Sequence, residues 1–233
     1  MSGELPNDGK ALTVTIEGTT FARIPIRTRV VMPGDSLDEV IAEYAADQVT
    51  DGDLLFITEK IVAITQGRSY TLDEIRPRRL ARFLSKYVTK TSYGIGLGMP
   101  ETMEMALREC GTPRILFAAA ISAMTKAFGR RGDFYRIAGD KARAIDGPTN
   151  GTIPPYDRAV VLGPTRPAEV AARIKSLLGR NVQVAVVDIN DIGGNILGST
   201  LDRAGERRLV RILADNPLGQ GRESTPLGII RAA

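Results

Sequence analysis

Oxygen-bearing side chains cluster directly after a short apolar run of the chain. Val184–Val187 has the composition of a buried strand, and Asp188, Asn190 and Asp191 follow it, ahead of the turn-forming Gly193. Carboxylate and amide oxygens are the ligands that Mg²⁺ and Mn²⁺ take in proteins, commonly shared with phosphates. The segment lacks the closing glutamate of an EF-hand loop. The pattern therefore predicts a divalent-metal site, and its alternative is an Asx-rich turn that only ends the strand.

The chain contains no histidine, and this absence excludes several kinds of catalytic site. Ser-His-Asp and Cys-His nucleophile systems need that residue, as do the usual His-bearing zinc sites. Cys110 is the only cysteine, so an intramolecular disulfide is excluded, in keeping with a reducing cytoplasm. Its place on the apolar face of a predicted helix favours a core position over a reactive thiol. Chemistry would therefore rely on carboxylates, lysine, arginine, hydroxyls and a bound ion.

The formal charge of +4 favours anionic ligands, and its excess is concentrated in Arg76–Lys86 and Lys126–Arg143. Six Tyr, six Phe and no Trp offer few platforms on which nucleic-acid bases could stack, so phosphorylated small molecules are favoured over nucleic acid. No apolar run approaches the ~18 residues of a membrane span, and Met1–Lys10 is polar. We therefore expect a cytoplasmic protein without a nucleic-acid or membrane partner.

The apolar pattern predicts a mixed α+β fold. Met1–Leu12 is expected to be a loose N-terminus, and residues 13–233 one domain divisible into two sub-domains. The predicted strands and extended segments are Thr13–Ile16, Phe21–Val31, Leu54–Thr58, Ala159–Leu162, Val184–Val187 and Leu227–Ile230. Ala159–Asp188 is expected to form a β-α-β unit with parallel strands, of which the second carries the predicted metal loop.

Helical spacing of apolar residues gives the other expected elements. The predicted helices are Leu37–Tyr44, Pro77–Tyr87, Glu101–Cys110, Ile115–Phe128, Pro167–Leu178 and Arg203–Leu213. In Pro77–Tyr87 we expect Leu80, Phe83 and Leu84 to point inward, and Ile115–Phe128 is expected to be well buried because it is rich in alanine. Glu59–Gly67 is compatible with a helix or a strand, since it is rich in β-branched residues.

Two polar segments could bind phosphate. Gly129–Tyr156 is expected to be an irregular basic insert, and loops of this length in a compact domain are usually functional. It holds Asp140 and Asp146 beside several arginines that include Arg143, although a solvated surface with ordinary salt bridges is the alternative. Thr91–Gly98 is rich in glycine and would either cradle phosphates or serve as a flexible connection.

Several short stretches, taken in their order along the chain, resemble the coenzyme F420-0:gamma-glutamyl ligase family. The motifs are Ile24-Pro25, Pro33-Gly34-Asp35, Asp51–Val62, Arg68, Ala138-Gly139, the Asp146 region, Asp188, Gly219-Gln220 and Thr225–Arg231. Each motif is short, so their order over most of the chain carries the resemblance. It implies the α+β fold of that family, a homodimer, and an enzyme that uses GTP and divalent cations to join glutamate to a carboxylate of a deazaflavin cofactor.

The resemblance also implies roles for particular residues. The nucleotide-contacting residues would be Ile24, Pro25, Ile26, Glu59 and Lys60. Asp188 matches a metal-binding aspartate of the family and Asp146 the other, with Asp140 as the competing match for that second position. Asp146 and Asp188 are therefore expected to share one divalent ion, Mg²⁺ or Mn²⁺.

The chain departs from the family pattern at three places. A second lysine of the family falls on Ile64, and the basic-aromatic run that usually follows the metal-binding aspartate is replaced by residues 189–198, which include Gly193 and Gly194. An acidic segment near the C-terminus is shortened, with Glu206 or Glu223 as substitutes. These changes affect the contacts to the nucleotide and to the acceptor substrate more than the metal-binding Asp188. The resemblance therefore implies the fold of the family more strongly than it implies action on F420-0.

The residue inventory suits the chemistry of an amide-bond ligase. A carboxylate is a poor electrophile, so GTP or ATP would convert it into an acyl phosphate that the L-glutamate amine attacks. Phosphoryl transfer needs positioning and charge neutralisation, which Lys60 and an arginine such as Arg143 could supply. Asp140 or Glu223 could accept the proton that the amine loses. The alternatives are a ligase for another carboxylate, such as a folate, and a non-catalytic regulatory homologue that binds nucleotide and metal.

Overall fold

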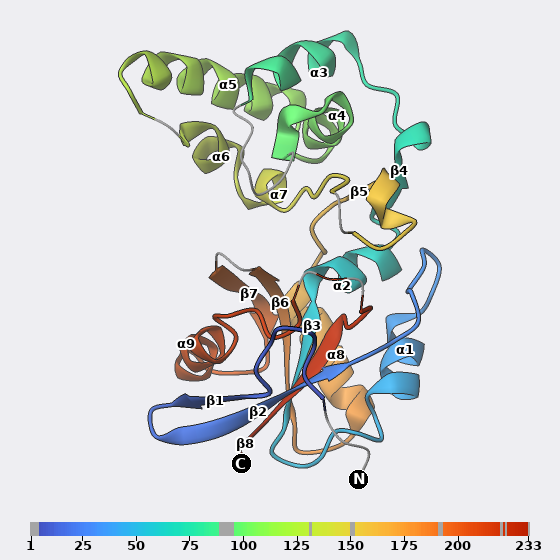
Figure 1. Cartoon of the computed structure of the whole chain (residues 1–233). Helices are drawn as coiled ribbons and strands as arrows, with labels where there is room; N and C mark the ends of the chain where they lie inside the picture. Colours follow the sequence, from blue (N-terminus) through green and yellow to red (C-terminus); the bar gives the residue numbers. More distant parts are fainter. Residues whose placement is uncertain are drawn as a thin grey trace. The chain divides into compact units, whose positions relative to one another are not determined.

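The computed structural model describes residues 5–88, 96–130, 132–149, 152–190, 193–219, 221 and 223–232. The chain folds as two compact units, each with helices and strands (Figure 1). Unit 1 comprises Met1–Gly67 and Pro164–Ala233, and unit 2 is the intervening Arg68–Gly163. The predicted α+β class is confirmed.

Unit 1 is built on a six-stranded mixed sheet in the order β1-β2-β8-β3-β6-β7. Its strands are β1 (Thr13–Ile16), β2 (Thr19–Ile26), β3 (Leu54–Thr58), β6 (Gln183–Asn190), β7 (Gly193–Ser199) and β8 (Leu227–Ala232). The predicted bounds of β1 and β3 are confirmed. The alternating apolar residues of β1 end at a turn that contains Gly18, and the continuous apolar run of β3 ends where α2 begins. β3 runs parallel to β6, whereas β8 runs antiparallel to both β2 and β3.

Four helices of unit 1 cover the sheet. They are α1 (Leu37–Tyr44), α2 (Glu59–Thr65), α8 (Pro167–Leu178) and α9 (Arg203–Ile212). α9 lies on one face, where Leu209 and Ile212 pack with Ala185 and Val187 of β6. α1 and α8 lie on the opposite face (Figure 1). Glu59–Thr65, which the sequence left open between helix and strand, is therefore helical.

The expected β-α-β unit is wrong in its first strand. β5 (Ala159–Val161) pairs antiparallel with β4 (Ser69–Thr71) in a separate two-stranded sheet of unit 2. The parallel neighbour of β6 is β3, and the chain between them passes through unit 2 before α8. The apolar run of β5 is only three residues long, so long-range pairing rather than local pattern decides its partner.

A buried carboxylate ties the start of β3 to the end of β8. Asp53 is 2% exposed and accepts hydrogen bonds from Arg231 Nε at 2.9 Å and Nη2 at 2.7 Å, and from the Thr50 amide at 2.8 Å. Burial alone would raise the pKa of Asp53, but the bonds from Arg231 and Thr50 outweigh it and hold that pKa below its ordinary value. Because the pKa of Asp53 is lower in the folded state, ionised Asp53 stabilises the fold. This stabilisation is present above the pKa of an unfolded aspartate, about 3.9, and is lost as the pH falls through the folded-state pKa.

Gly228 lies in the middle of the sheet where no side chain fits. A Cβ at this position would lie 2.4 Å from Phe56 Cζ and 3.2 Å from the Ile24 carbonyl oxygen, and Phe56 is 1% exposed. We expect Gly228→Ala to destabilise unit 1 by about 1–3 kcal/mol through overpacking, measured as a lowered midpoint in thermal unfolding. Gly193→Ala in β7 is the matched control, because nothing lies within 4 Å of a Cβ there. Equal unfolding midpoints for the two variants would contradict the expectation.

Unit 2 is mainly helical. Its helices are α3 (Arg79–Leu84), α4 (Pro100–Glu109), α5 (Thr112–Ala127), α6 (Asp133–Ala138) and α7 (Asp140–Arg143). Single 3₁₀ turns occur at Leu72–Glu74, Ser85–Tyr87, Gly96–Gly98 and Tyr156–Arg158. Its core gathers Met103, Ala106 and Leu107 of α4 with Ile115 and Ala118 of α5. Cys110 is half-buried against this core, as expected, and burial raises the pKa of its thiol.

Three expectations about unit 2 change. Phe83 was expected to point inward but is 56% exposed, while Leu84 is buried. α5 was expected to be well buried, yet only Ile115 and Ala118 of this helix are. The basic insert is less irregular than expected, because α6 and α7 form within it. Among the described residues, no helix has the length and apolar character needed to cross a membrane.

Candidate functional site

The carboxyl ends of three strands meet at one edge of the unit 1 sheet. β2, β3 and β6 run in the same direction, since β8 is antiparallel to β2 and β3 while β6 is parallel to β3. One row across the sheet is formed by Ile26, Leu227, Ile57 and Val186. Asp188 follows this row by two residues on β6. Glu59, the first residue of α2, follows it by two residues directly beyond the end of β3, the strand that neighbours β6 at about 4.8 Å. Ligands bind at such carboxyl edges in many α/β proteins.

Asp188 lies near the end of β6 and faces Asn195 of β7. The two residues are direct partners in the antiparallel register, so their side chains lie on the same face of the sheet. Side chains alternate along β6, which places Asp188 on the face opposite to Ala185 and Val187, and therefore away from α9. Asn190 shares that face and pairs with Gly193. The position of Asn195 directly opposite Asp188 depends on the strand register, which the sequence alone does not give.

A β-bulge lies beside this pair. The β6–β7 register shifts between Val186, which pairs with Gly198, and Val187, which pairs with Ile196. Gly198 lies against the start of α8, where an added Cβ would come within 2.2 Å of the Ala168 amide nitrogen. Bulges re-aim side chains and are common next to active sites. The bulge thus fixes the direction in which the end of the β6–β7 hairpin leaves the sheet.

Residues of α2 begin where β3 ends. Glu59 and Lys60 follow Thr58 directly and are half-buried, whereas the next four residues of the helix are buried. Ile64, the position at which the resemblance implies a second lysine, is 4% exposed. An apolar side chain suits this core position, where an unpaired ammonium group would be costly. α2 therefore presents one lysine at the carboxyl edge.

The predicted contacts at the end of β2 are largely enclosed. Ile24 and Ile26 are 4% and 1% exposed, and they pair with Ile229 and Leu227 of β8. Pro25 is half-buried. The two isoleucine side chains thus belong to the core of unit 1, and Pro25 has the more accessible side chain of the three.

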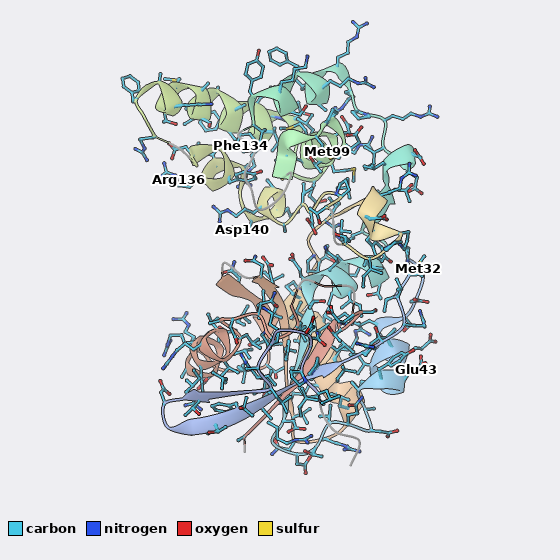
Figure 2. All side chains as sticks on the ribbon, viewed as in Figure 1. Met32, Glu43, Met99, Phe134, Arg136 and Asp140 are labelled. Atoms are coloured by element: carbon cyan, nitrogen blue, oxygen red, sulfur yellow. The ribbon has the colours of Figure 1, made fainter. Side chains whose placement is uncertain are left out.

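The remaining predicted residues belong to unit 2. Asp140 and Arg143 form an ion pair on α7, with the Asp140 side chain 99% exposed (Figure 2). Asp146 is half-buried and exchanges backbone hydrogen bonds with Val161 of β5 at 2.8 and 2.9 Å. Because Asp146 and Asp188 lie in different units, their sharing of one ion stays a prediction. Asp191 lies outside the described residues, as do most residues of Thr91–Gly98.

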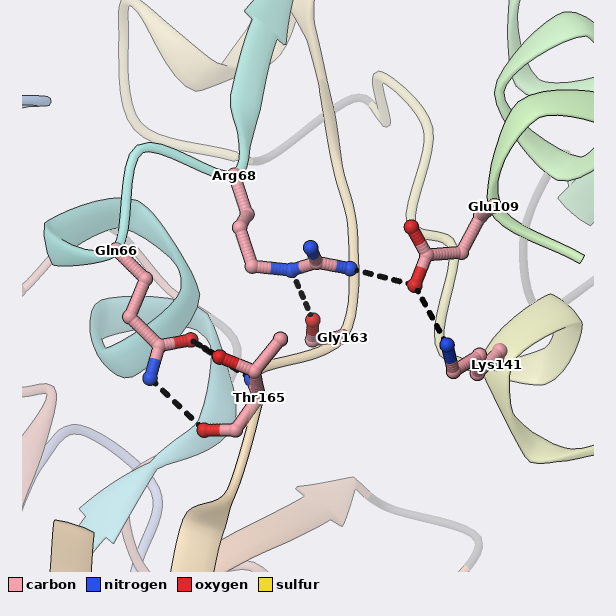
Figure 3. Close-up of polar contacts among 6 residues, drawn as sticks. All are labelled: Gln66, Arg68, Glu109, Lys141, Gly163 and Thr165. Atoms are coloured by element: carbon pink, nitrogen blue, oxygen red, sulfur yellow. Dashed lines mark hydrogen bonds and ion pairs between the residues drawn. The ribbon is translucent and has the colours of Figure 1, made fainter.

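Arg68 organises a polar network at the start of unit 2 (Figure 3). Its Nε donates to the Gly163 carbonyl oxygen at 2.6 Å, and its Nη2 lies 2.8 Å from Glu109 Oε1, which Lys141 Nζ also approaches at 3.5 Å. Within unit 1, the Gln66 side chain bonds the backbone of Thr165 through both its amide oxygen and nitrogen. These contacts indicate structural roles, since each group pairs with a neighbour in its own unit.

The donor set at the end of β6 is compatible with a hard cation. Asp188 supplies a carboxylate, and Asn190 and Asn195 supply amide oxygens on the same face. Within the described residues, no three or more His, Cys, Asp or Glu side chains form a metal-binding group. Mg²⁺ is commonly held by one or two carboxylates together with substrate phosphates. The arrangement therefore suits an ion shared with a phosphorylated ligand better than an all-protein metal cage.

Comparison with known proteins decides the family. A family model described as F420-0:Gamma-glutamyl ligase matches residues 25–200. The chain belongs to this family. A relative from Methanopyrus kandleri, named coenzyme F420:L-glutamate ligase, is 28% identical over 231 residues, with 87% of this chain and 83% of the relative covered.

Membership of the F420-0:gamma-glutamyl ligase family confirms the resemblance seen in the sequence. The matched range contains β2 from Pro25 onward, β3 with the start of α2, all of unit 2 and the β6–β7 hairpin. The family match therefore covers all of unit 2 and part of unit 1. Of the residues predicted to take part in the site, Ile24, Glu206 and Glu223 lie outside it. A ligase family of this kind forms carbon–nitrogen bonds, which agrees with the enzyme class expected from the sequence.

Proposed function

We propose that this protein is a nucleotide- and divalent-metal-dependent amide-bond ligase that adds L-glutamate to a carboxylate other than F420-0. The observation that carries the proposal is the meeting of Glu59, Lys60 and Asp188 at one edge of the unit 1 sheet, in a chain of the F420-0:gamma-glutamyl ligase family. The name of the Methanopyrus kandleri relative supports glutamate as the amine substrate. GTP is the expected nucleotide and ATP its alternative.

In the proposed reaction a substrate carboxylate oxygen attacks the γ-phosphorus of the nucleotide, which releases the nucleoside diphosphate and leaves an acyl phosphate. The glutamate nitrogen then forms the amide bond, and phosphate departs as the amine loses a proton. Lys60 would hold the phosphates, and Asp188, with Asn190 and Asn195, would hold Mg²⁺ or Mn²⁺. The ion, when bound, supplies positive charge for the transferred phosphoryl group.

Lys60 provides a direct test of the nucleotide site. We expect Lys60→Ala to weaken GTP binding by about 1–3 kcal/mol, because an ammonium–phosphate hydrogen bond is charge-assisted. Isothermal titration calorimetry with Mg²⁺ present measures the change. Lys175→Ala is the matched control, since Lys175 bonds Gln183 at the opposite end of β6. Unchanged GTP affinity in a folded Lys60→Ala protein would assign Lys60 a surface role.

A non-catalytic regulatory protein that binds nucleotide and metal is the second candidate. The buried Ile64 favours it, because a lysine that the family uses is absent there. Nucleotide hydrolysis separates the two functions. A ligase should release phosphate only when glutamate and a carboxylate acceptor are both present, and the product should gain the mass of one glutamate residue. A regulatory homologue should bind GTP without acceptor-dependent phosphate release across a panel of carboxylates that includes folates.

A further inference from the structure

The side chain of Asn7, near the N-terminus, is bonded to the part of the chain that leads into β8. Asn7 is 8% exposed, and its Nδ2 donates to the Leu218 carbonyl oxygen at 2.7 Å and to the Thr225 hydroxyl oxygen at 2.6 Å. A buried side-chain amide is costly unless it is hydrogen-bonded, so these two bonds determine where Asn7 lies. One side chain thus holds both ends of the stretch from Leu218 to Thr225.

The residues that follow Asn7 are anchored to unit 1 as well. Lys10 Nζ donates to the Asp215 carbonyl oxygen at 3.0 Å. Arg23 of β2, which is 1% exposed, donates from Nη2 to the Ala11 carbonyl oxygen and from its backbone amide to the Leu12 carbonyl oxygen, both at 2.7 Å. The N-terminal segment (residues 7–12) is therefore held along its length, which fixes the direction from which Asn7 reaches its partners.

The residues just ahead of β8 (residues 223–226, the edge segment) lie at the carboxyl edge of the sheet. The Ser224 carbonyl oxygen accepts a hydrogen bond from the Thr28 amide at 2.9 Å, two residues beyond the end of β2. The Pro226 carbonyl oxygen accepts one from the amide of Thr58, the last residue of β3, at 3.0 Å. The edge segment thus lies between the ends of β2 and β3, because β8 begins between these two strands.

The edge segment has a conformation that its neighbours must maintain. Ser224 has a φ of +51°, a value that residues other than glycine adopt at a cost and keep only where the surroundings fix it. The half-buried Glu223 folds its carboxylate over Gly221, where an added Cβ would lie 2.3 Å from Glu223 Oε2. Thr225 is the next residue after Ser224, and its hydroxyl is the one that Asn7 holds.

We propose that Asn7 is a positioning residue, which holds the edge segment so that Glu223 is presented at the carboxyl edge where Lys60 begins to form α2 with its neighbours. The inference rests on the proposed function, which places the nucleotide at this edge. The family model matches residues 25–200, so Asn7 and the edge segment both lie outside the matched range. If the segment loosens, only the fraction of molecules in which it is ordered binds well, and the apparent affinity falls by that fraction.

Hydrogen exchange tests the structural half of this inference. Asn7→Asp keeps the size of the side chain but removes both N–H donors and sets a carboxylate against the Leu218 carbonyl oxygen. Exchange of the Thr28 amide, whose acceptor is the Ser224 carbonyl oxygen, should accelerate at least about tenfold in this variant. Nuclear magnetic resonance of the full chain measures the rate, and circular dichroism checks that the variant is folded.

Calorimetry of GTP with Mn²⁺ tests the functional half. Asn7→Asp should weaken GTP binding about tenfold relative to the wild type. Gln48→Glu is the matched control, because it makes the same change from amide to carboxylate and breaks a bond of 2.6 Å to the Tyr44 carbonyl oxygen, at an exposed position of unit 1 ahead of β3. This control should bind GTP like the wild type.

Thr225→Val is a second variant that removes one of the two acceptors of Asn7. It should weaken GTP binding less than Asn7→Asp, and the double variant should bind no more weakly than Asn7→Asp alone, because Thr225 has then already lost its partner. Additive losses in the double variant would overturn the inference, since the two side chains would then act independently.

The remaining outcomes separate this inference from the proposed function. Equal GTP affinity of the folded Asn7→Asp and Gln48→Glu proteins, with a wild type that binds GTP, would overturn the role of Asn7 and leave the proposed function standing. A lower unfolding temperature of Asn7→Asp without faster exchange at Thr28 would assign Asn7 to stability alone. A wild type that binds no GTP in the presence of Mn²⁺ would overturn the proposed function, and the inference with it.

Discussion

Asp188→Asn is expected to weaken Mn²⁺ binding in the presence of GTP about a hundredfold. The substitution keeps the size of the side chain but removes the carboxylate charge at the end of β6, where Asn190 and Asn195, the described oxygen donors on the same face, are amides. Neutral amides alone are weak ligands for a hard divalent cation. Electron paramagnetic resonance of free Mn²⁺ measures the loss without knowledge of the acceptor. Asn195→Ala should weaken the same binding less, because it removes a neutral donor.

Asp47→Asn is the matched control for Asp188. Asp47 is exposed in unit 1 and follows α1, away from the β6–β7 hairpin in sequence and in register. Its substitution changes the net charge by the same amount, so it reports the effect of charge alone. Equal Mn²⁺ affinity of the folded Asp188→Asn and Asp47→Asn proteins would refute the metal site. If Asp146 shares the ion, Asp146→Asn should show a loss similar to that of Asp188→Asn.

The strands of unit 1 were predictable where local pattern and burial agree. Leu54–Thr58 is a continuous apolar run between a glycine turn and a helix start, and the structure gives β3 these bounds. Because Glu59 and Lys60 follow β3 directly, their place at the carboxyl edge could be anticipated. The partner of β6 could not, since β3 reaches it across more than a hundred intervening residues that include unit 2. Local periodicity carries no information about such a connection.

The helices of unit 2 show a second reason why the sequence predicts only part of the structure. Apolar residues surround most of α5, so its composition indicates a buried helix. The structure exposes Phe117 and Met124 while Ile115 and Ala118 are buried, because one side alone packs on the unit core. Helical spacing identifies the apolar positions of a helix. It does not show which of two apolar sides packs against the rest of the protein. The same reason explains the exposure of Phe83 on α3.

The position of Asn195 depends on register in the same way. Six residues separate it from Asp188, and both could be read as parts of one polar turn. β7 instead returns antiparallel to β6 with a bulge, and this pairing sets Asn195 directly opposite Asp188. A one-residue change of register would turn the two side chains to opposite faces. The sequence therefore predicts which segment holds the metal ligands. Which of these ligands face each other becomes known only from the strand pairing in the structure.

The purified protein is expected to glutamylate F420-0 poorly or not at all, although it belongs to the F420-0:gamma-glutamyl ligase family. The residues after Asp188, from 189 to 198, contain neither a basic nor an aromatic side chain. In the described part of this segment β7 begins with Gly193, where nothing lies within 4 Å of an added Cβ. Loss of a phosphate-pairing arginine and of a stacking ring costs about 1–3 kcal/mol each. Together they should weaken binding of a phosphorylated deazaflavin roughly a hundredfold or more.

Mass spectrometry of the deazaflavin after incubation with GTP, Mn²⁺ and L-glutamate measures this specificity. The Methanopyrus kandleri relative, named coenzyme F420:L-glutamate ligase, is the positive control under the same conditions. Binding of GTP with Mn²⁺ by the present protein, followed by calorimetry, shows that its nucleotide site is intact in the same preparation. We expect elongated product from the relative and little or none from this chain. Elongation at a rate comparable to that of the relative, with micromolar F420-0, would refute the altered specificity, because the β6–β7 hairpin would then bind the deazaflavin without an arginine or an aromatic ring.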